Sequence, residues 1–487
     1  MINLVDYIRS DCSIVLPDGQ TLSPREIQAY KNFYKKELYT KLNGNTVGKV
    51  VLIWSNNLDV ILPAIKAIWE LGAIISVHDF SLNVVTHPLF KNFYKHIDVI
   101  IGPPLADSVL IDLPHVSALE TKMSYPAYVD GKIHQEVFPI TCDLYPDVDY
   151  QLNGAITDDT VCCVTHTSGT TGEPKIVKTT HKVAIELVQE NIKLFEFRAT
   201  DRVLHHKTLH HGSLFLNYAI PAFVTTNQHY WTIQKTSETV IGFMEKCLDL
   251  CVTGKISKWL TPYRFITELG NPNIKSYNIS STSLITAVGP SQHEMKLIFD
   301  KQHPDAVYNN FGCTELGTLA ISKTQLNNIA EYAPNRFTKL NGLIDWEIFP
   351  DFFKAKFKND HEWRTIGDIV KFSNDVFFWE GRNSCLTFDQ QKIKVSAIDK
   401  WTREWLNTSA FSLVPDFEVN ALYIAVFDTT LDLTLNDLNQ ALKSTAEFKN
   451  CVFSKMAQIE FKDVVQGIKP SQPVLLHYFR GLPVEIV

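Results

Sequence analysis

The chain has 487 residues, of which 45% are hydrophobic, 11% aromatic and 20% charged. Its 46 Lys and Arg residues face 53 Asp and Glu residues, and the resulting net charge of −7 gives no basic footprint for nucleic acid or an anionic membrane. The apolar fraction is sufficient for folded cores, and the length predicts about two to four domains.

The cysteines and the hydropathy pattern bear on the cellular location. The nine cysteines are scattered without C-x-x-C spacing, which favours free thiols in a reducing compartment over a disulfide framework. The N-terminal segment has charges within its apolar stretch, unlike a signal peptide, and no apolar run reaches about 18 residues. We therefore expect a cytoplasmic protein with no membrane span and no nucleic-acid partner.

The first clear supersecondary unit lies between Lys49 and Asp79. KVVLIW predicts a buried strand, and the apolar residues that recur at helical spacing from Leu58 to Trp69 predict a helix. AIISV, which follows Gly72, predicts a second strand. DVIIG at 98–102 and TVCCVT at 160–165 have the same buried-strand character. This order predicts a parallel sheet with crossover helices.

The composition changes near residues 380–384, where the aromatic run DVFFWEGRN passes into a more polar tail. Beyond it, residues 421–427, LNDLNQALKS and residues 455–461 read as strand, helix and strand. The sequence therefore predicts an α/β protein with a large N-terminal domain over residues 1–381. Mainly parallel sheets and flanking helices form that domain, and a small α+β domain occupies residues 382–487.

The segment TSGTTGEPK directly follows the predicted strand at 160–165. Its hydroxyl residues and glycines let the backbone take unusual conformations and direct N–H groups at an anion, as in a phosphate cradle. The spacing is not that of a Walker A loop, and a hydroxyl-rich surface turn is the alternative. The candidate phosphate-binding residues are Thr167, Ser168, Gly169, Thr170, Thr171, Gly172 and Lys175.

The full nine-residue string resembles the phosphate-loop signature of the adenylate-forming superfamily, which includes acyl-CoA synthetases, peptide-synthetase adenylation domains and luciferases. NNFGCTELG resembles a second motif of this superfamily. The resemblance implies that Phe311 packs on adenine, Thr314 contacts phosphate and Glu315 is a Mg²⁺ ligand, with Asn310 and Gly312 beside the nucleotide. The alternative is that Phe311 is a core aromatic and Glu315 starts a helix.

Two further segments fit the same resemblance. LITAVGPSQHEM resembles the turn that lines adenine, here Gly289, Pro290 and Ser291, although an ordinary strand-to-helix turn is the alternative. WRTIGDIVKF implies that Asp368 binds the ribose hydroxyls, with Ile366 where the family usually has Thr.

WEGRNSC resembles the hinge to a small mobile C-terminal domain, with Arg382 on ribose or phosphate. Ser384 stands at the hinge position, where Asp or Lys is usual, and Lys392 replaces a usual Gly. Lys469 resembles the catalytic lysine that reaches the reacting carboxylate, although it could be an exposed turn lysine.

The histidine-rich segment LHHKTLHHGSLF contains His205, His206, His210 and His211. His206 and His210 are spaced i, i+4, but no carboxylate or Cys nearby completes a metal site. The resemblance instead implies that His211, before Gly212, gates the acyl pocket, with His210 as the second choice.

The resemblance implies activation of a carboxylic acid by ATP and Mg²⁺ to an acyl-adenylate, with release of pyrophosphate. Lys175 would steady the pyrophosphate and Lys469 would guide the attacking oxygen, because positioning and electrostatics dominate such transfers. The expected enzyme is an AMP-forming acid–thiol ligase with coenzyme A as acceptor. Two alternatives stay open: an amino-acid or aryl-acid adenylating enzyme that loads the phosphopantetheine of a carrier protein, and a degenerate nucleotide or acyl-adenylate binder without turnover.

Overall fold

The computed structural model describes residues 3–55, 57–78, 95–102, 114–117, 127–129, 132–134, 145–166, 176–206, 215–232, 238–261, 263–287, 289–349, 352–366, 368–373, 376–382, 385–388, 391–406, 411–416, 421–426, 433–445, 448, 451–458, 465–466, 469–470, 475 and 479. Packing divides the chain into two units. Unit 1 comprises Met1–Thr167 and Pro174–Leu343, and unit 2 comprises Ser168–Glu173 and Ile344–Val487. The domain boundary expected after residue 381 and the hinge near Ser384 stay predictions.

The first sheet of unit 1 has six strands in the order β10-β9-β4-β3-β5-β6. Its members are β3 (Val50–Trp54), β4 (Ile74–His78), β5 (Val99–Gly102), β6 (His115–Ser117), β9 (Val161–His166) and β10 (Ile176–Thr180). All neighbours run parallel except the edge strand β10. The predicted strand, helix and strand are β3, α2 (Leu58–Glu70) and β4, as expected for a crossover unit.

The second sheet of unit 1 has nine strands in the order β18-β16-β15-β14-β13-β11-β12-β1-β2. Six neighbouring strands from β15 to β1 run parallel, and β16, β18 and β2 are antiparallel additions at the edges. The strands are β1 (Ser13–Val15), β2 (Thr21–Leu22), β11 (Arg202–His205), β12 (Gln228–Trp231), β13 (Lys258–Leu260), β14 (Ser283–Thr286), β15 (Ala306–Cys313), β16 (Gly317–Thr324) and β18 (Lys339–Leu340). The predicted α/β class is confirmed.

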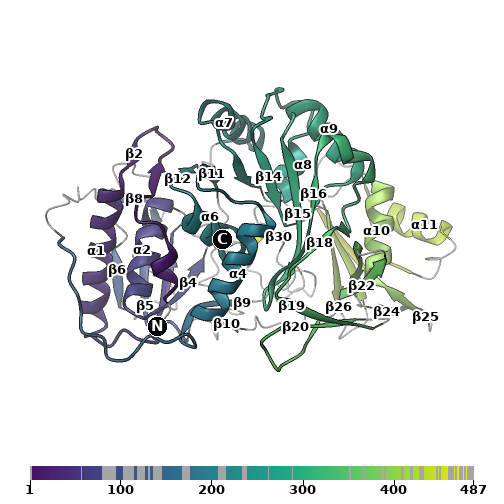
Figure 1. The fold of residues 1–487 in the computed structure, drawn as a ribbon. Helices are drawn as coiled ribbons and strands as arrows, with labels where there is room; N and C mark the ends of the chain where they lie inside the picture. Colours follow the sequence, from purple (N-terminus) through teal and green to yellow (C-terminus); the bar gives the residue numbers. More distant parts are fainter. Residues whose placement is uncertain are drawn as a thin grey trace. The chain divides into compact units, whose positions relative to one another are not determined.

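Further elements of unit 1 connect or flank these sheets. The helices are α1 (Pro24–Lys41), α4 (His181–Leu194), α6 (Ile220–Thr225), α7 (Val240–Thr253), α8 (Tyr263–Glu268), α9 (Gln292–Gln302), the 3-10 helices η1 (Leu4–Tyr7) and η5 (Leu326–Glu331), and the π-helix η4 (Phe215–Ala219). The short strands are β7 (Ala127–Val129), β8 (Lys132–His134) and β17 (Arg336–Phe337). Figure 1 shows α1 and α2 beside β5 and β6.

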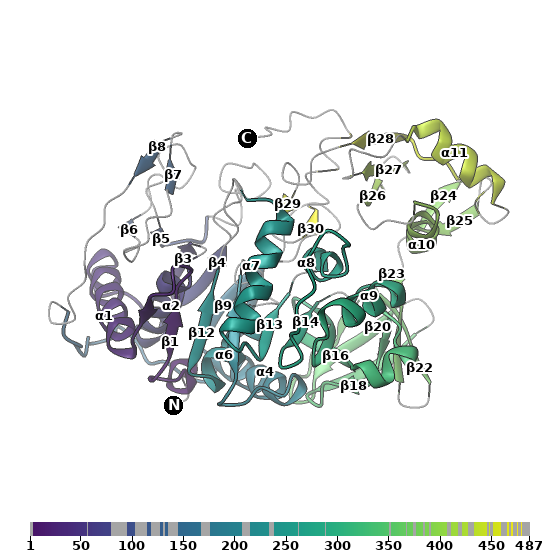
Figure 2. The ribbon, with the colours of Figure 1, turned by 90° about the horizontal axis from the view of Figure 1, so that it is seen from above.

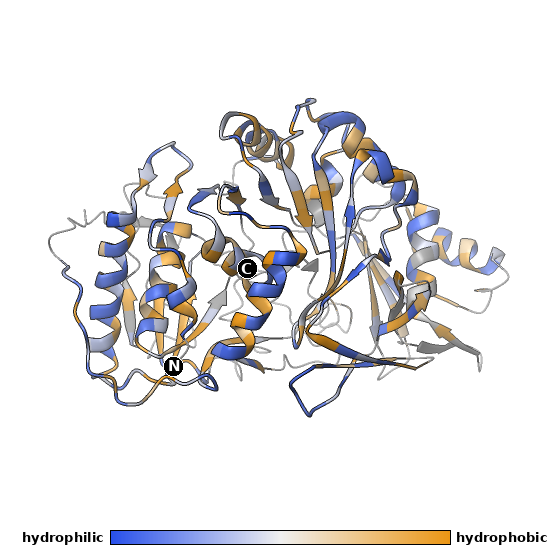
Figure 3. Cartoon of the chain, in the orientation of Figure 1, coloured by the Kyte–Doolittle hydropathy of each residue, from blue (hydrophilic) through white to orange (hydrophobic). Residues whose placement is uncertain are grey.

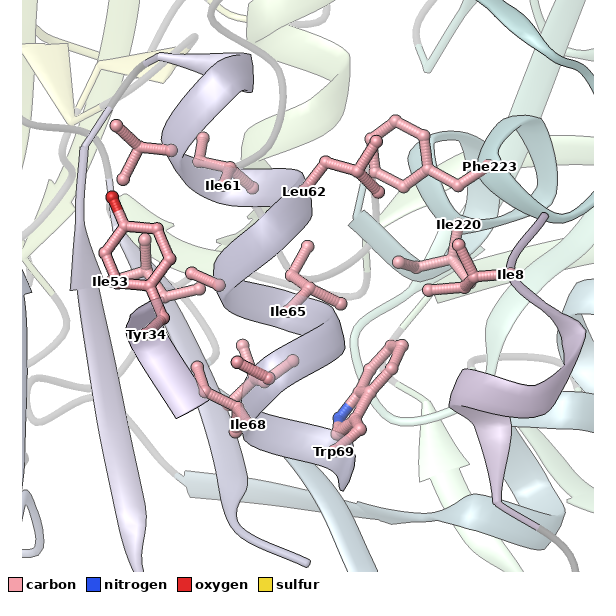
Figure 4. Packing of buried hydrophobic residues seen from close by; sticks show 14 of the residues in the cluster. Ile8, Tyr34, Ile53, Ile61, Leu62, Ile65, Ile68, Trp69, Ile220 and Phe223 are labelled. Atoms are coloured by element: carbon pink, nitrogen blue, oxygen red, sulfur yellow. The ribbon is translucent and has the colours of Figure 1, made fainter. Parts of the chain in front are cut away.

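One hydrophobic core of unit 1 surrounds α2, which is buried from Leu58 to Trp69. A helix that is apolar on all sides must be enclosed, and α1, α4 and α6 with both sheets enclose it. Figure 4 shows Ile65 and Trp69 of this helix directed toward Ile220. The Trp69 indole Nε1 donates to the Cys162 carbonyl at 2.9 Å, which fixes the helix to β9.

A second core covers the other face of the nine-stranded sheet. This core contains Leu204, Trp259 and Leu284 of the sheet together with residues of α7, α8 and α9. Figure 2 shows these three helices beside β13 and β14. Tyr308 of β15 points to the opposite face, where its ring centroid lies 6.0 Å from that of Phe195. Because both faces are covered, consecutive residues of a strand are buried, as in β14, where all four residues are buried. Figure 3 shows orange, hydrophobic segments among the strands of unit 1.

Unit 2 begins with antiparallel strands. The strands β19 (Ile344–Ile348), β20 (Phe353–Phe357) and β21 (Arg364–Ile366) form one meander, and β22 (Asp368–Ser373) pairs with β23 (Val376–Arg382). An aromatic cluster links the two groups, because the Trp346 ring centroid lies 5.4 Å from that of Phe353 and 5.3 Å from that of Phe377.

The remainder of unit 2 is the predicted α+β region. Its elements are β24 (Cys385–Phe388), β25 (Gln391–Lys394), α10 (Val395–Leu406), β26 (Phe411–Asp416), β27 (Ala421–Val426), α11 (Leu435–Ser444), β28 (Lys455–Gln458), β29 (Val465–Gln466) and β30 (Lys469–Pro470). The strands β27 and β28 pair in parallel with α11 between them in the chain, and both helices pack on a core that includes Ile398, Ile424 and Leu438. Over the described residues of both units, every helix is too short or too polar to cross a bilayer.

Candidate functional site

The predicted phosphate loop, from Thr167 to Lys175, lies outside the described residues, but the structure places both of its ends. It connects β9 to β10, which pair in antiparallel fashion with His166 opposite Ile176. The loop therefore leaves and returns at neighbouring strands, at the carboxyl end of β9. In open parallel sheets ligands bind outside the carboxyl ends of the strands, so this is a suitable place for a phosphate loop.

The predicted adenine turn connects β14 to α9 in unit 1. Gly289 is so enclosed that a Cβ atom added there would lie 2.3 Å from the Tyr332 hydroxyl and 2.6 Å from Asn309 Nδ2. The Tyr332 hydroxyl donates to the Pro290 carbonyl at 2.6 Å, and Asn309 Nδ2 donates to the Pro334 carbonyl at 2.8 Å. The turn is therefore fixed by side chains on both sides.

Ser291, the last residue of this predicted turn, has a structural role. Its hydroxyl accepts from the Glu294 amide at 3.2 Å, and its own amide donates to the Glu294 carboxylate at 2.6 Å. This reciprocal pair is a capping box that starts α9. The ordinary strand-to-helix turn considered for this segment thus describes Ser291 well, and its proposed contact with nucleotide stays a prediction.

The segment NNFGCTELG forms the turn between β15 and β16, next to β14 in the sheet. Asn310, Phe311 and Gly312 belong to β15, and Thr314 and Glu315 follow in the turn. The alternative in which Glu315 starts a helix does not apply, because the chain enters β16 instead. The Phe311 ring is half-buried, 5.6 Å from the Phe337 ring, so one part of it packs on the protein.

Two glycines shape this turn. A Cβ atom at Gly312 would lie 2.3 Å from the Gly317 carbonyl oxygen, and the pairing register shifts between Phe311 and Gly312 as in a β-bulge. Gly317 has a φ of +71°, which favours glycine. The pairing continues past the bulge to Cys313, which lies opposite Gly317, and the Glu315 side chain in the turn between them is exposed.

The Cys313 thiol lies within this turn. Burial raises its pKa well above the ordinary value, and the neighbouring Glu315 carboxylate raises it further. A thiol in these surroundings stays protonated at neutral pH, and it is therefore poorly suited as a nucleophile. The carboxylate of Glu315, in contrast, is a group of this turn that can bind a cation.

A single exposed carboxylate is compatible with a magnesium ion. Mg²⁺ in nucleotide enzymes is held by one or two carboxylates together with the phosphates of the substrate and water. Within the described residues, no three His, Cys, Asp or Glu side chains gather as an all-protein metal site. The residues present thus fit an ion shared with a bound nucleotide.

The structure shows two of the four clustered histidines. His205 is the last residue of β11, His206 follows it, and both are buried, whereas His210 and His211 lie outside the described residues. His205 Nε2 lies 3.2 Å from Nδ1 of His229, and burial lowers the pKa of both rings, that of His229 to about 3. The His206 ring centroid lies 4.9 Å from that of Phe265, so the two described histidines belong to the core.

The remaining predicted residues lie in unit 2. Asp368 is buried at the start of β22, and Trp379 Nε1 donates to its Oδ1 at 3.0 Å. Arg382 is the cross-strand partner of Asp368 in the register of β22 and β23. Lys469 starts β30, which pairs with β29. Ser384 lies outside the described residues.

The structure thus brings the predicted residues together in two groups. In unit 1, Asn309 of β15 lies against the Gly289 turn, and the same strand leads to the β15–β16 turn. In unit 2, Asp368 and Arg382 are cross-strand partners. Sequence reasoning did not single out Asn309, Tyr332 or Trp379. Asn309 belonged to the quoted motif, whereas nothing near Tyr332 in the sequence indicated its contact.

A family model described as AMP-binding enzyme matches residues 13–339, which is more than half of the chain. A search among curated protein sequences finds no match. Solved structures with a similar fold include McyG A-PCP complexed with phenylalanyl-adenylate, with 16% identity, 98% of this chain and 94% of that chain covered, and a TM-score of 0.71.

Two further similar structures are nucleotide complexes. ATP-bound MatB from Rhodopseudomonas palustris has 14% identity, covers 98% of this chain and 99% of its own, and has a TM-score of 0.72. The O-succinylbenzoate coenzyme A synthetase MenE from Bacillus subtilis, in complex with ATP and magnesium ion, has 13% identity, 94% and 96% coverage, and a TM-score of 0.69. At these identities the likeness establishes the fold.

Proposed function

The chain belongs to the family of AMP-binding enzymes, and on this premise we propose that it uses ATP to convert a carboxylic acid into an acyl-adenylate, with release of pyrophosphate. The observation that carries the proposal is the arrangement around β15. An enclosed turn at Gly289 and an exposed carboxylate at Glu315 follow the carboxyl ends of adjacent parallel strands, where a nucleotide can bind.

The residues proposed to bind adenine, the phosphates and Mg²⁺ divide by chemistry. The faces of Phe311 and the Gly289–Pro290 turn accept the adenine ring, with Ser291, Asn310 and Gly312 at its margins. Thr314 donates to phosphate and Glu315 holds Mg²⁺. The hydroxyl and backbone donors from Thr167 to Gly172 bind the outer phosphates together with Lys175, because such donors suit anions.

The residues of unit 2 and the acyl pocket complete the assignment. Asp368 accepts from the ribose hydroxyls, and the indole of Trp379 orients its carboxylate. Arg382 binds ribose or phosphate. Lys469 holds the reacting carboxylate of the acid against the α-phosphate, and His211 gates the acyl pocket.

The proposed step is a substitution at phosphorus. An oxygen of the substrate carboxylate bonds to the α-phosphorus of ATP, and the bond from that phosphorus to the bridging oxygen breaks, so that the electron pair leaves with pyrophosphate. No protein nucleophile is required, because positioning and charge stabilisation supply most of the acceleration in phosphoryl chemistry. Mg²⁺ would supply positive charge to the phosphate oxygens.

For the second half-reaction we propose transfer of the acyl group to the thiol of coenzyme A. The structures of similar fold include a coenzyme A synthetase, which supports this acceptor. They also include McyG A-PCP complexed with phenylalanyl-adenylate, which supports the second candidate, an enzyme that loads a carrier protein. Seven of the cysteines within the described residues are free thiols, in keeping with the cytoplasmic location that we propose.

Pyrophosphate exchange into ATP with a panel of carboxylic acids tests the proposal. We expect exchange that requires one class of acid and falls about a hundredfold or more in Glu315→Gln. Asp300→Asn, which neutralises an exposed carboxylate on α9, is the matched control and should retain exchange. Nucleotide binding without exchange for any acid would instead support the degenerate binder.

Addition of coenzyme A to the active mixture distinguishes the two acceptors. A thioester of coenzyme A supports the first candidate. Acyl-adenylate that accumulates in the presence of coenzyme A supports a separate carrier protein.

A further inference from the structure

Two buried amides meet behind the β15–β16 turn. Asn191 of α4 and Asn217 of the π-helix η4 are both fully buried. Asn191 Nδ2 donates to Asn217 Oδ1 at 3.3 Å. Neither Asn191 Oδ1 nor Asn217 Nδ2 has a hydrogen-bond partner among the described residues. Buried amides without full pairing cost stability, whereas an apolar side chain of similar size would not, so stability alone does not explain them.

Asn217 contacts the turn at Gly317. A Cβ atom at Gly317 would lie 2.9 Å from Asn217 Oδ1 and 3.2 Å from the Leu187 side chain. Gly317 is also the residue with a φ of +71°, and its carbonyl lies against Gly312. A shift of Asn217 therefore displaces the backbone only two residues from Glu315.

The next residue of the π-helix contacts the other arm of the same hairpin. The Tyr218 ring is buried 5.0 Å from the Phe195 ring. Burial raises the pKa of its hydroxyl, and the nearby Asn310 side chain opposes this shift. Consecutive residues of η4 thus touch both arms, and π-helical turns inserted in helices often occur at functional sites.

We propose that Asn217, held by Asn191, is a positioning residue for the turn that carries Thr314 and Glu315. This inference rests on the proposed function, in which the turn binds the Mg²⁺ ion and the phosphates of ATP. Asn217 touches no substrate in this scheme. It fixes Gly317, and Gly317 sets the direction in which the Glu315 carboxylate projects.

The test measures the response to magnesium in Asn217→Ala. We expect the Mg²⁺ concentration for half-maximal exchange to rise about three- to thirtyfold, the range for a coupled residue outside a site. With Mg²⁺ removed by excess chelator, the affinity for ATP should change less than about twofold, because the turn contributes to nucleotide binding through the Mg²⁺ ion. Thr226→Val, which removes a fully buried hydroxyl group without a hydrogen-bond partner among the described residues, is the matched control and should leave both values unchanged.

A double substitution tests the contact itself. Gly317→Ala should impair magnesium activation because of both its φ and its contact with Asn217. Asn217→Ala in the same chain removes the contact between the methyl group added at position 317 and the Asn217 side chain. The double variant should therefore lose less magnesium activation than the product of the two single losses. If Asn217→Ala does not fold, Asn191→Ala releases the Asn217 amide and is judged by the same values.

Two results would overturn the inference. One is an unchanged magnesium response in Asn217→Ala; the other is an equal loss of ATP affinity with and without Mg²⁺, which indicates general disruption. The proposed function fails differently, through absence of exchange in the wild type with every acid. In that case calorimetric ATP binding with and without Mg²⁺ still decides whether Asn217 couples the turn to the ion.

Discussion

Replacement of Gly289 by alanine should destabilise the turn between β14 and α9. The added methyl group would lie 2.3 Å from the Tyr332 hydroxyl and 2.6 Å from Asn309 Nδ2, far inside ordinary contact distance. Neither group can retreat freely, because the first donates to the Pro290 carbonyl and the second to the Pro334 carbonyl.

The magnitude follows from these contacts. Overpacking of an enclosed site costs about 1–3 kcal/mol. Displacement of one donor loses a hydrogen bond worth about 1 kcal/mol. We therefore expect the free energy of unfolding of Gly289→Ala to fall by about 2–4 kcal/mol. Tyr332→Phe removes the closer obstacle, so the double variant should lose less than the two single losses combined.

Urea unfolding followed by fluorescence measures these values, and titration with ATP shows whether the intact turn is needed for nucleotide affinity. Gly154→Ala is the control, because its Cβ atom would meet only Val47 at an ordinary 3.5 Å. A Gly289→Ala variant as stable as the wild type, or a double variant with fully additive losses, would refute the close contact described for this turn.

Three more predictions concern titration, thiol reactivity and the ribose site. Burial lowers the pKa of His181 to about 4. In the unfolded chain the pKa of His181 is about 6.5, so the unfolded state binds more protons between pH 6.5 and 4. The free energy of unfolding should therefore fall by about 3 kcal/mol as pH drops from 6.5 to 4 and should not depend on His181 above pH 6.5. Urea unfolding of His181→Asn should show no such pH dependence, and an unchanged dependence contradicts the assignment. Burial raises the pKa of Cys12 and Cys163 to about 12, so mass spectrometry should find both unalkylated by iodoacetamide at about pH 8 in native protein and alkylated in urea, and rapid native labelling would contradict their burial. Trp379→Phe removes the hydrogen-bond donor to Asp368 and should weaken ATP binding about three- to tenfold, with a smaller loss of affinity for 2′-deoxy-ATP. Equal losses of affinity for both nucleotides would show that Trp379 does not act through a ribose contact.

The sequence predicted elements whose local pattern agrees with their surroundings. The apolar spacing from Leu58 to Trp69 and the β-branched runs on each side predicted α2, β3 and β4, because burial on all sides leaves continuous apolar segments. The same reasoning predicted β27, α11 and β28. Pro63 lies inside α2, which spans Leu58–Glu70.

Contacts between distant segments were beyond prediction. Tyr332 reaches the Pro290 carbonyl across 42 positions, and no local pattern indicates such a pair. The π-helix at Phe215–Ala219 depends on how its residues pack on α4 and the hairpin, which propensity does not encode. Glu315 could be assigned to a turn rather than a helix start only once β16 was placed against β15.

Transfer of an isotope from acid to nucleotide tests the central claim most directly. With an ¹⁸O-labelled carboxylic acid that supports exchange, and hydroxylamine to intercept the acyl group, we expect hydroxamate and AMP that carries one heavy oxygen. The label follows because the acid oxygen bonds to the α-phosphorus and stays there when the acyl carbon is attacked. AMP formed without label, or no AMP with any acid in the panel, would contradict the account.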